Sequence, residues 1–67
     1  MRIKELREAA GLTQRELAKR LGVSGPAVAQ WETGENRPST ANLARLADVF
    51  DCSTDYILGR ETRNVRV

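Results

Sequence analysis

Residues 11–39 read GLTQRELAKRLGVSGPAVAQWETGENRPS, and this stretch predicts two short helices joined by a very tight turn. Thr13, followed three residues later by Glu16, fits the capping-box pattern with which many helices begin. The helix that starts there is expected to end at Gly22, since glycine readily adopts the left-handed conformation that follows a helix. Ser24 then provides a favourable N-cap for the next helix. Only a Gly-Val-Ser turn separates the two helices, so they must cross at a steep angle.

The second helix of this pair divides into an inward and an outward face. Val28 and Trp31 lie one turn apart and predict the inward face, which favours a core role for Trp31 over a stacking platform. Pro26 fits the first turn, where backbone amides have no partner within the helix, and Gly34 ends the helix. The side chains expected to face outward are Gly25, Pro26, Ala29, Gln30 and Thr33. Together the two helices form the arrangement known as helix-turn-helix.

Three more helices are expected around this pair. Residues 2–10 carry one apolar stripe and end before a glycine, and residues 39–50 repeat apolar residues at helical spacing behind a serine cap. A last short helix runs from a cap at Ser53 to Gly59. The inward residues predicted for the two longer helices are Ile3, Leu6, Ala10, Leu43, Leu46, Ala47 and Phe50. The predicted fold class is all-α, a compact five-helix domain with the helix-turn-helix at its second and third helices.

Composition narrows the possible functions. A chain of 67 residues suffices for one domain, and 11 Lys and Arg against 9 Asp and Glu give a net charge of +2, which is compatible with nucleic acid without arguing for it. Without histidine, and with Cys52 as the single cysteine, the chain lacks the usual general bases and most zinc-ligand sets. We therefore expect no enzyme activity, cofactor or metal, and a core position for Cys52. Because no apolar run is long enough for a membrane span or a signal peptide, we expect a cytoplasmic protein.

Residues 11–39, together with LARLADVFDCSTDYILG at residues 43–59, resemble the phage repressor and Cro type of protein, also called the xenobiotic-response-element family of bacterial and phage regulators. The resemblance covers residues 1–59 and implies a lambda-repressor-like DNA-binding domain, leaving residues 60–67 as a flexible basic tail or the start of a linker. It implies a sequence-specific transcriptional regulator that binds a palindromic operator in double-stranded DNA as a homodimer, with repression as the default and activation as the alternative. The same fold could instead serve an antitoxin or an interaction module for a toxin or other protein partner.

The resemblance also implies which residues read bases. In the family the third helix enters the major groove by its N-terminal end. The corresponding positions here are Gln30, Pro26 and Gly25, with Ser24 and Ala29 at the margin. The Gln30 amide matches N6 and N7 of adenine, whereas Pro26 and Ala29 can contact only a thymine methyl. The alternative is that Gly25 and Pro26 only shape the start of the helix.

Candidate phosphate contacts surround these positions. Gln14 lies in the first turn of the second predicted helix, whose unpartnered amides suit an anion, although it could be an ordinary solvated residue. Arg15 projects from the same helix, and Asn36 and Arg37 follow the third helix in a loop that touches phosphate in the family. Three arginines of the tail could form a flexible arm on DNA or merely keep the chain soluble: Arg60, Arg63 and Arg66.

Other residues are assigned structural roles by the same resemblance. Arg7 and Glu32 correspond to a pair that forms a partly buried salt bridge in relatives. Asp51 stands where relatives often have glycine, so a left-handed backbone is expected there. The dimer surface is expected near the last helix, with Tyr56 and Ile57 as candidates and burial in the core as the alternative for both.

Overall fold

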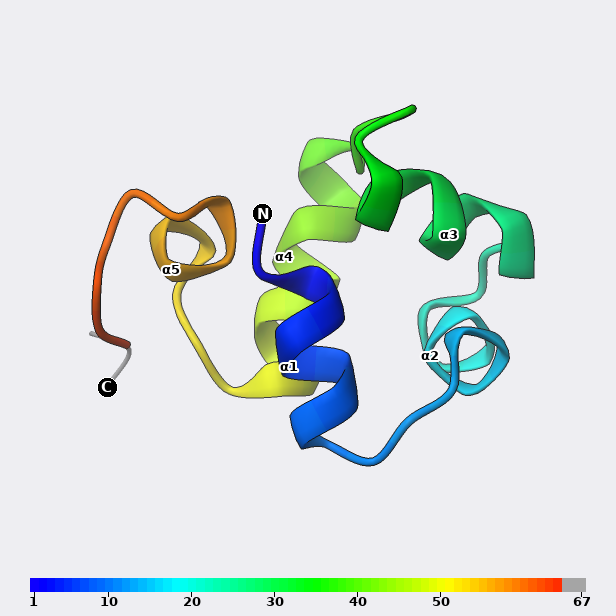
Figure 1. The fold of residues 1–67 in the computed structure, drawn as a ribbon, viewed down its shortest axis with the longest axis horizontal. Coiled ribbons are helices and arrows are strands. Elements are labelled where there is room, and N and C mark those ends of the chain that lie inside the picture. Colours follow the sequence, from blue (N-terminus) through cyan, green and yellow to red (C-terminus); the bar gives the residue numbers. More distant parts are fainter. Residues whose placement is uncertain (65–67) are drawn as a thin grey trace.

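The computed structural model describes residues 1–64, which form five helices and no strand over that range (Figure 1). The helices are α1 (Ile3–Ala9), α2 (Gln14–Leu21), α3 (Gly25–Thr33), α4 (Thr40–Phe50) and α5 (Thr54–Leu58). Helices α2 and α3 lie together on one side of the molecule, α5 lies on the other, and α1 and α4 fill the space between them. The all-α fold with a helix-turn-helix at α2 and α3 is confirmed. Within the described residues, no helix is long and apolar enough to cross a membrane.

Local capping explains most of the helix boundaries. The Thr13 hydroxyl accepts a hydrogen bond from the Glu16 amide at 3.1 Å, and the Glu16 carboxylate accepts one from the Thr13 amide at 2.9 Å, which completes the predicted capping box. The hydroxyls of Ser39 and Ser53 cap α4 and α5 in the same way. Ser24 occupies the N-cap position of α3, but its side chain makes no capping hydrogen bond.

Helices α2 to α5 all end in the left-handed conformation, and two of these ends, Gly22 and Asp51, reach it in different ways. Gly22 has φ of 72° in the turn between α2 and α3, where a side chain would add strain. Asp51 has φ of 51° at the end of α4, the positive φ expected for it from the resemblance. It is the single residue other than glycine with positive φ among residues 1–64. An aspartate tolerates this conformation better than most residues do, so α4 can end here without glycine.

The core is built from all five helices and from Cys52, the second residue after α4. Its buried members are Ile3, Leu17, Ala18, Leu21, Val28, Trp31, Leu46, Ala47, Cys52 and Ile57. Cys52 and Trp31 are therefore core residues, as predicted. The prediction for Ala10 is wrong, because α1 ends at Ala9 and the exposed Ala10 already belongs to the turn. Leu6, Leu43 and Phe50 are only partly buried and pack against the rim of the core.

Residues 60–64 fold back onto the end of the domain. The amides of Arg60 and Glu61 donate to the carbonyl oxygen of Asp55 at 2.9 and 3.3 Å. The Asn64 side chain donates to the carbonyl oxygen of Asp51 at 2.8 Å and accepts from the Ser53 amide at 3.1 Å. The described part of the expected tail is thus held against α5, and Arg66 lies outside the described residues.

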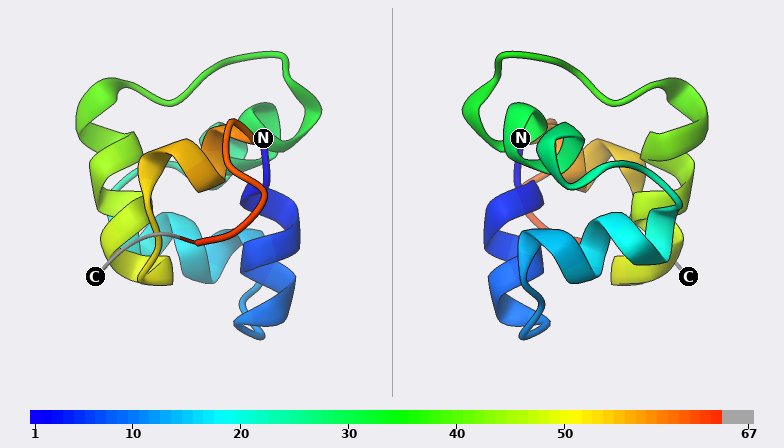
Figure 2. Two further views of the ribbon diagram at one scale, coloured as in Figure 1. Left: turned by 90° about the vertical axis from the view of Figure 1, so that its left-hand side faces the viewer. Right: turned by 90° about the vertical axis from the view of Figure 1, so that its right-hand side faces the viewer.

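The N-terminus also packs against this end of the fold, beside α5 and the end of α3 (Figure 2). The Arg2 amide donates to the carbonyl oxygen of Ile57 at 2.8 Å, and its guanidinium donates to the carbonyls of Tyr56 and Glu61 at 2.9 and 3.0 Å. The same guanidinium lies 4.6 Å from the centre of the Tyr56 ring, within the range of a cation–π contact. Arg2 therefore joins the two ends of the described chain, a role that the sequence did not indicate.

Candidate nucleic-acid interface

Helices α2 and α3 form a rigid unit that holds the N-terminal end of α3 at the surface. They pack against each other more extensively than any other two helices do, through the buried side chains of Leu17, Leu21 and Val28. The turn between them is closed by a hydrogen bond of 3.0 Å from the Val23 amide to the carbonyl oxygen of Ala18. A well-packed pair with so short a turn has little freedom to change its crossing angle.

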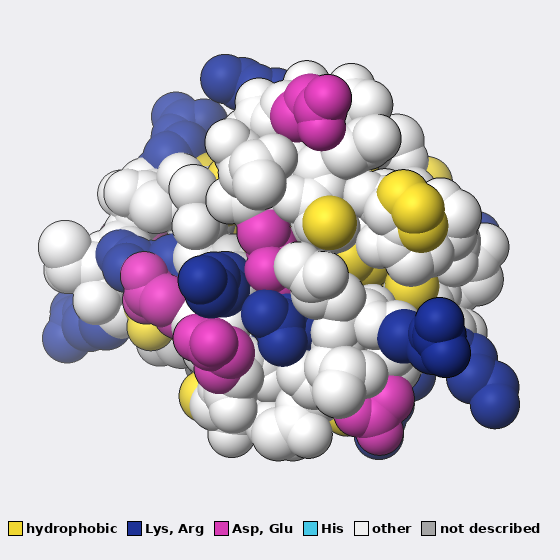
Figure 3. Space-filling view, turned by 45° about the vertical axis from the view of Figure 1, so that its right-hand side comes forward, with side chains coloured by type: hydrophobic (Ala, Val, Ile, Leu, Met, Phe, Trp, Pro, Cys, Tyr) yellow, Lys and Arg dark blue, Asp and Glu magenta, His cyan; other side chains and the backbone are white. Residues whose placement is uncertain are grey.

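The outward surface of α3 is small and uncharged. Ser24 and Pro26 are exposed, and Gly25, Ala29 and Gln30 are half-buried. In the space-filling view small apolar side chains emerge over α3, while basic and acidic side chains mix over the rest of the same face (Figure 3). All five predicted base-reading residues therefore lie together on one accessible surface.

The loop after α3 folds back onto Gln30. The Asn36 side-chain amide donates from Nδ2 to Oε1 of Gln30 at 3.1 Å, and the Asn36 backbone amide donates to the Gln30 carbonyl oxygen at 3.2 Å. The Thr33 hydroxyl donates to that same carbonyl oxygen, also at 3.2 Å. We call the side chains of Gln30 and Asn36 the amide pair. Arg37 follows as an exposed side chain and lines a hollow of about 420 Å³ with Met1, Trp31 and Leu58.

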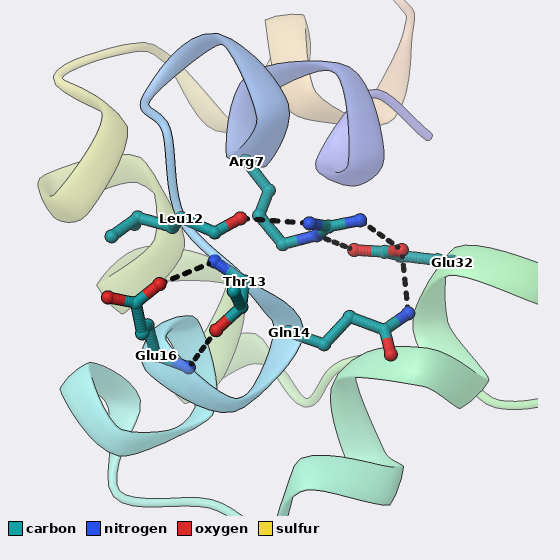
Figure 4. A network of polar contacts seen from close by, with 6 residues as sticks. All are labelled: Arg7, Leu12, Thr13, Gln14, Glu16 and Glu32. Carbon is teal, nitrogen blue, oxygen red and sulfur yellow. Dashed lines mark hydrogen bonds and ion pairs between the residues drawn. The ribbon is translucent and has the colours of Figure 1, made fainter.

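A second group of polar side chains joins α1, α2 and α3 (Figure 4). Arg7 donates from Nε and Nη2 to the two carboxylate oxygens of Glu32 at 2.6 and 3.2 Å, and from Nη1 to the Leu12 carbonyl oxygen at 2.8 Å. Gln14 donates from Nε2 to Oε1 of Glu32 at 3.0 Å. The side chains of Arg7 and Glu32 are 12% and 4% exposed, so the ion pair expected from the resemblance is present and largely buried. We call Arg7, Glu32 and Gln14 the buried cluster.

The charges of the buried cluster stabilise each other. Burial alone would raise the pKa of the Glu32 carboxyl, but hydrogen bonds from Arg7 and Gln14 outweigh burial and hold this pKa below its ordinary value. The hydrogen bond to Glu32 in turn raises the pKa of the Arg7 guanidinium. Both groups are therefore charged at neutral pH. Gln14 belongs to this cluster as well as to the first turn of α2, which the sequence did not reveal.

The N-terminus of α2 offers fewer unpartnered amides than the sequence suggested. The capping box uses the amides of Thr13 and Glu16. The unpartnered amides expected at the start of α2 are therefore those of Gln14 and Arg15 only. The exposed Arg15 side chain follows the same turn and keeps this corner basic.

The two residues expected at a dimer surface have different environments. Ile57 is 0% exposed and packs within the core, so it is a core residue, the alternative considered for it from the sequence. Tyr56 is half-buried, with the Arg2 guanidinium over its ring. Of the two, Tyr56 is the one that remains partly exposed.

Comparison with known proteins agrees with this geometry. A family model described as helix-turn-helix matches residues 3–57. The chain is 37% identical over 60 residues to the HTH-type transcriptional regulator ImmR of Bacillus subtilis (strain 168), covering 90% of this chain and 47% of that protein. It is 40% identical over 57 residues to repressor protein C2 of Salmonella phage P22, covering 85% of this chain and 26% of that protein. The chain thus spans less than half the length of each of these relatives.

The fold is also that of a solved structure. The crystal structure of the P22 c2 repressor in complex with a synthetic operator superposes with a TM-score of 0.80 at 39% identity, covering 84% of this chain and 85% of that chain. In that structure the P22 c2 repressor is bound to its synthetic operator.

Proposed function

The chain belongs to the phage repressor and Cro type of helix-turn-helix family, whose members are DNA-binding transcriptional regulators and not enzymes, and from this premise we propose that it binds an operator in double-stranded DNA. The observation that carries the proposal is the accessible, uncharged end of α3, held on a rigid pair of helices. In this proposal α3 enters the major groove by its N-terminal end. The activity takes place in the cytoplasm, where such a regulator meets DNA.

Base reading falls on the outward face of α3. Gln30 lies one turn after Pro26, so both reach the same stretch of groove. Gln30 recognises one base through its amide, while Pro26 and Ala29 contact thymine methyl groups and Gly25 and Ser24 allow close approach of the backbone. Gln30 is the one side-chain amide on this face, so sequence discrimination is concentrated at the base pair that Gln30 meets.

Phosphate contacts come from the borders of this face. Arg37, in the loop after α3, and Arg15, in the first turn of α2, are exposed and supply charge. The amides that begin α2, with Gln14, bind a phosphate at the helix N-terminus. Asn36 lies in the same loop as Arg37 and is a further candidate for this role. A net charge of +2 is small, so affinity depends on these few contacts rather than on a broad basic surface.

We infer a homodimer on a palindromic operator from the size of the module. One domain of this kind buries only about 600–1,000 Å² on DNA, which is too little for tight specific binding. Two copies reach half-sites about 10 bp apart, and an occupied operator blocks other proteins, which makes repression the expected outcome. In this proposal residues 1–59 are the DNA-binding unit, residues 60–67 are a basic tail or the start of a linker, and Tyr56 lies at the edge of the dimer surface.

The decisive experiment is selection from a random duplex library with purified protein at two salt concentrations. A palindrome with half-sites about one helical turn apart, recovered at both concentrations, supports a dimeric regulator. Loss of that enrichment in Gln30→Ala and Arg37→Ala links it to α3 and its loop. If uniform, salt-sensitive binding is all that remains, the proposal fails in favour of a protein-interaction module, such as an antitoxin, on the same fold.

A further inference from the structure

The amide pair limits how Gln30 can present itself to DNA. A glutamine amide carries an oxygen with two acceptor positions and a nitrogen with two donor hydrogens. In the structure Asn36 donates to Oε1 of Gln30 at 3.1 Å, so one acceptor position is occupied while both Nε2 hydrogens remain for another partner. Turning the Gln30 amide by half a turn while the Asn36 amide keeps its orientation would bring two donors against each other and lose this bond.

The loop is placed to make this contact with little loss of freedom. The Asn36 backbone amide and the Thr33 hydroxyl both bind the Gln30 carbonyl oxygen at 3.2 Å, and the Glu35 amide donates to the Thr33 hydroxyl at 3.4 Å. The backbone at Asn36 is therefore fixed relative to Gln30 before either side chain is considered. Only the side-chain torsions of Gln30 and Asn36 remain to be ordered, which lowers the entropic cost of an exposed hydrogen bond.

We propose that Asn36 is a positioning residue that sets base specificity by fixing the orientation of the Gln30 amide. The inference rests on the proposed DNA binding and replaces a phosphate contact as the main role of Asn36. A fixed amide offers donors from Nε2 and one acceptor position on Oε1, which is the set that adenine N7 and N6 require. Without Asn36 the amide turns freely, and a turned amide also satisfies other base edges.

The test uses four duplexes that carry the selected operator and differ only at the base pair that loses its preference in Gln30→Ala. We compare each variant by the ratio of its affinity for the preferred duplex to that for the next best, so that uniform losses cancel. Asn36→Ala is expected to lower this ratio about three- to tenfold with little change in salt dependence. Asn36→Asp is expected to change which base is preferred, because its carboxylate only accepts and the Gln30 amide must turn to donate.

Two controls separate positioning from other effects. Adding Asn36→Ala to Gln30→Ala should leave the ratio as Gln30→Ala alone leaves it, because no amide remains to be oriented. Asn42→Ala, which removes the same side chain from α4, should leave the ratio unchanged. Equal weakening on all four duplexes by Asn36→Ala, with the ratio unchanged, would identify a phosphate contact and overturn the proposal.

A measurement without DNA tests the coupling between the Asn36 and Gln30 side chains separately from DNA binding. In the free protein, Asn36→Ala is expected to change the chemical shifts of the Gln30 side-chain NH2 signals, whereas Asn42→Ala leaves these shifts unchanged. Unchanged Gln30 signals in Asn36→Ala overturn the coupling whether or not DNA is bound. If the Gln30 signals respond but the wild-type protein binds no duplex, the proposed function fails, and the specificity role of Asn36 fails with it.

Discussion

The buried cluster and the amide pair use the same polar chemistry at two depths. In the buried cluster Arg7 and Glu32 are 12% and 4% exposed and connect three helices, whereas the Gln30–Asn36 contact lies at the surface within one helix and its following loop. A buried charge without a partner is costly, while an exposed amide without one turns to water. The comparison teaches that the buried cluster holds α3 in place and the amide pair adjusts what α3 can read.

The largest test breaks the buried cluster. Arg7→Ala leaves the Glu32 carboxylate largely buried without its ion-pair partner, and we expect the free energy of unfolding to fall by about 3 kcal/mol, the lower end for buried pairs in so small a domain. Urea denaturation measures this loss. The control is Glu35→Ala, which removes an exposed acid just after α3, the helix that carries Glu32. A loss below about 1 kcal/mol would contradict the importance given to burial here.

Acid should weaken the same cluster without any mutation. The folded pKa of Glu32 is held below its ordinary value of 4.5, so folding is favoured by its ionisation above that pH, and this contribution is lost as pH falls through the folded pKa. The pKa of Glu16 is also lowered, chiefly by the backbone hydrogen bond from Thr13, so its ionisation favours folding in the same direction. Unfolding free energies measured from about pH 5 to pH 3 should fall less steeply in Glu32→Gln than in the wild-type chain. Identical slopes would mean that Glu32 does not contribute to acid unfolding.

The depth of the buried cluster also explains what the sequence predicted and what it missed. Helix caps and apolar spacing are local, so the five helices and most of the core follow from short stretches of sequence. The apolar stripe nevertheless continued to Ala10, because spacing alone does not say where a helix ends. Gln14 binds Glu32 across 18 positions of the chain, a distance over which only the packing of α2 against α3 decides the contact.

The candidate site shows the same division. The base-reading positions came from the family resemblance, and the period of one short helix placed Gly25, Pro26, Ala29 and Gln30 on its outward face. The contact from Asn36 to Gln30 depends on the path of the loop after α3, and no spacing rule gives that path. The position of Arg2 over Tyr56 joins residues 54 positions apart and likewise depends on the whole fold.

At the surface, a mutation should change binding and leave folding intact. Gln30→Ala removes the one amide on the outward face of α3, and we expect a loss of about 1–3 kcal/mol of discrimination at a single base pair. The free energy of unfolding of this variant should stay within about 0.5 kcal/mol of the wild-type value, because the Gln30 side chain is only half-buried and bonds mainly to an exposed loop. Competition binding on matched duplexes, with urea denaturation alongside, measures both. A larger loss of stability than of discrimination would mean that the amide pair, like the buried cluster, serves mainly to hold the fold.

Gln14 belongs to the buried cluster and is also a candidate phosphate contact, so its substitution tests how far the two roles are separate. Gln14→Ala takes one hydrogen bond from Glu32 while leaving the Arg7 pair, so stability should fall by about 0.5–1.5 kcal/mol. If Gln14 also binds phosphate, the variant weakens binding equally on preferred and altered duplexes and leaves their ratio unchanged. Gln14→Glu is the informative companion, because it places a second carboxylate against Glu32 and the DNA. A ratio that changes in Gln14→Ala would mean that the buried cluster reaches into base reading.

The smallest effect is expected from Asn36→Ala in the absence of DNA. Its side chain is exposed and bonds only one other exposed amide atom, so the free energy of unfolding should change by less than about 0.5 kcal/mol. Hydrogen exchange at the Gln30 and Asn36 backbone amides tests the loop separately, since the backbone bond from Asn36 to the Gln30 carbonyl does not need the side chain. A stability loss near that of Gln14→Ala would mean that the amide pair holds the loop itself in place. The effect of Asn36 on base preference would then follow from the loop and not from the orientation of one amide.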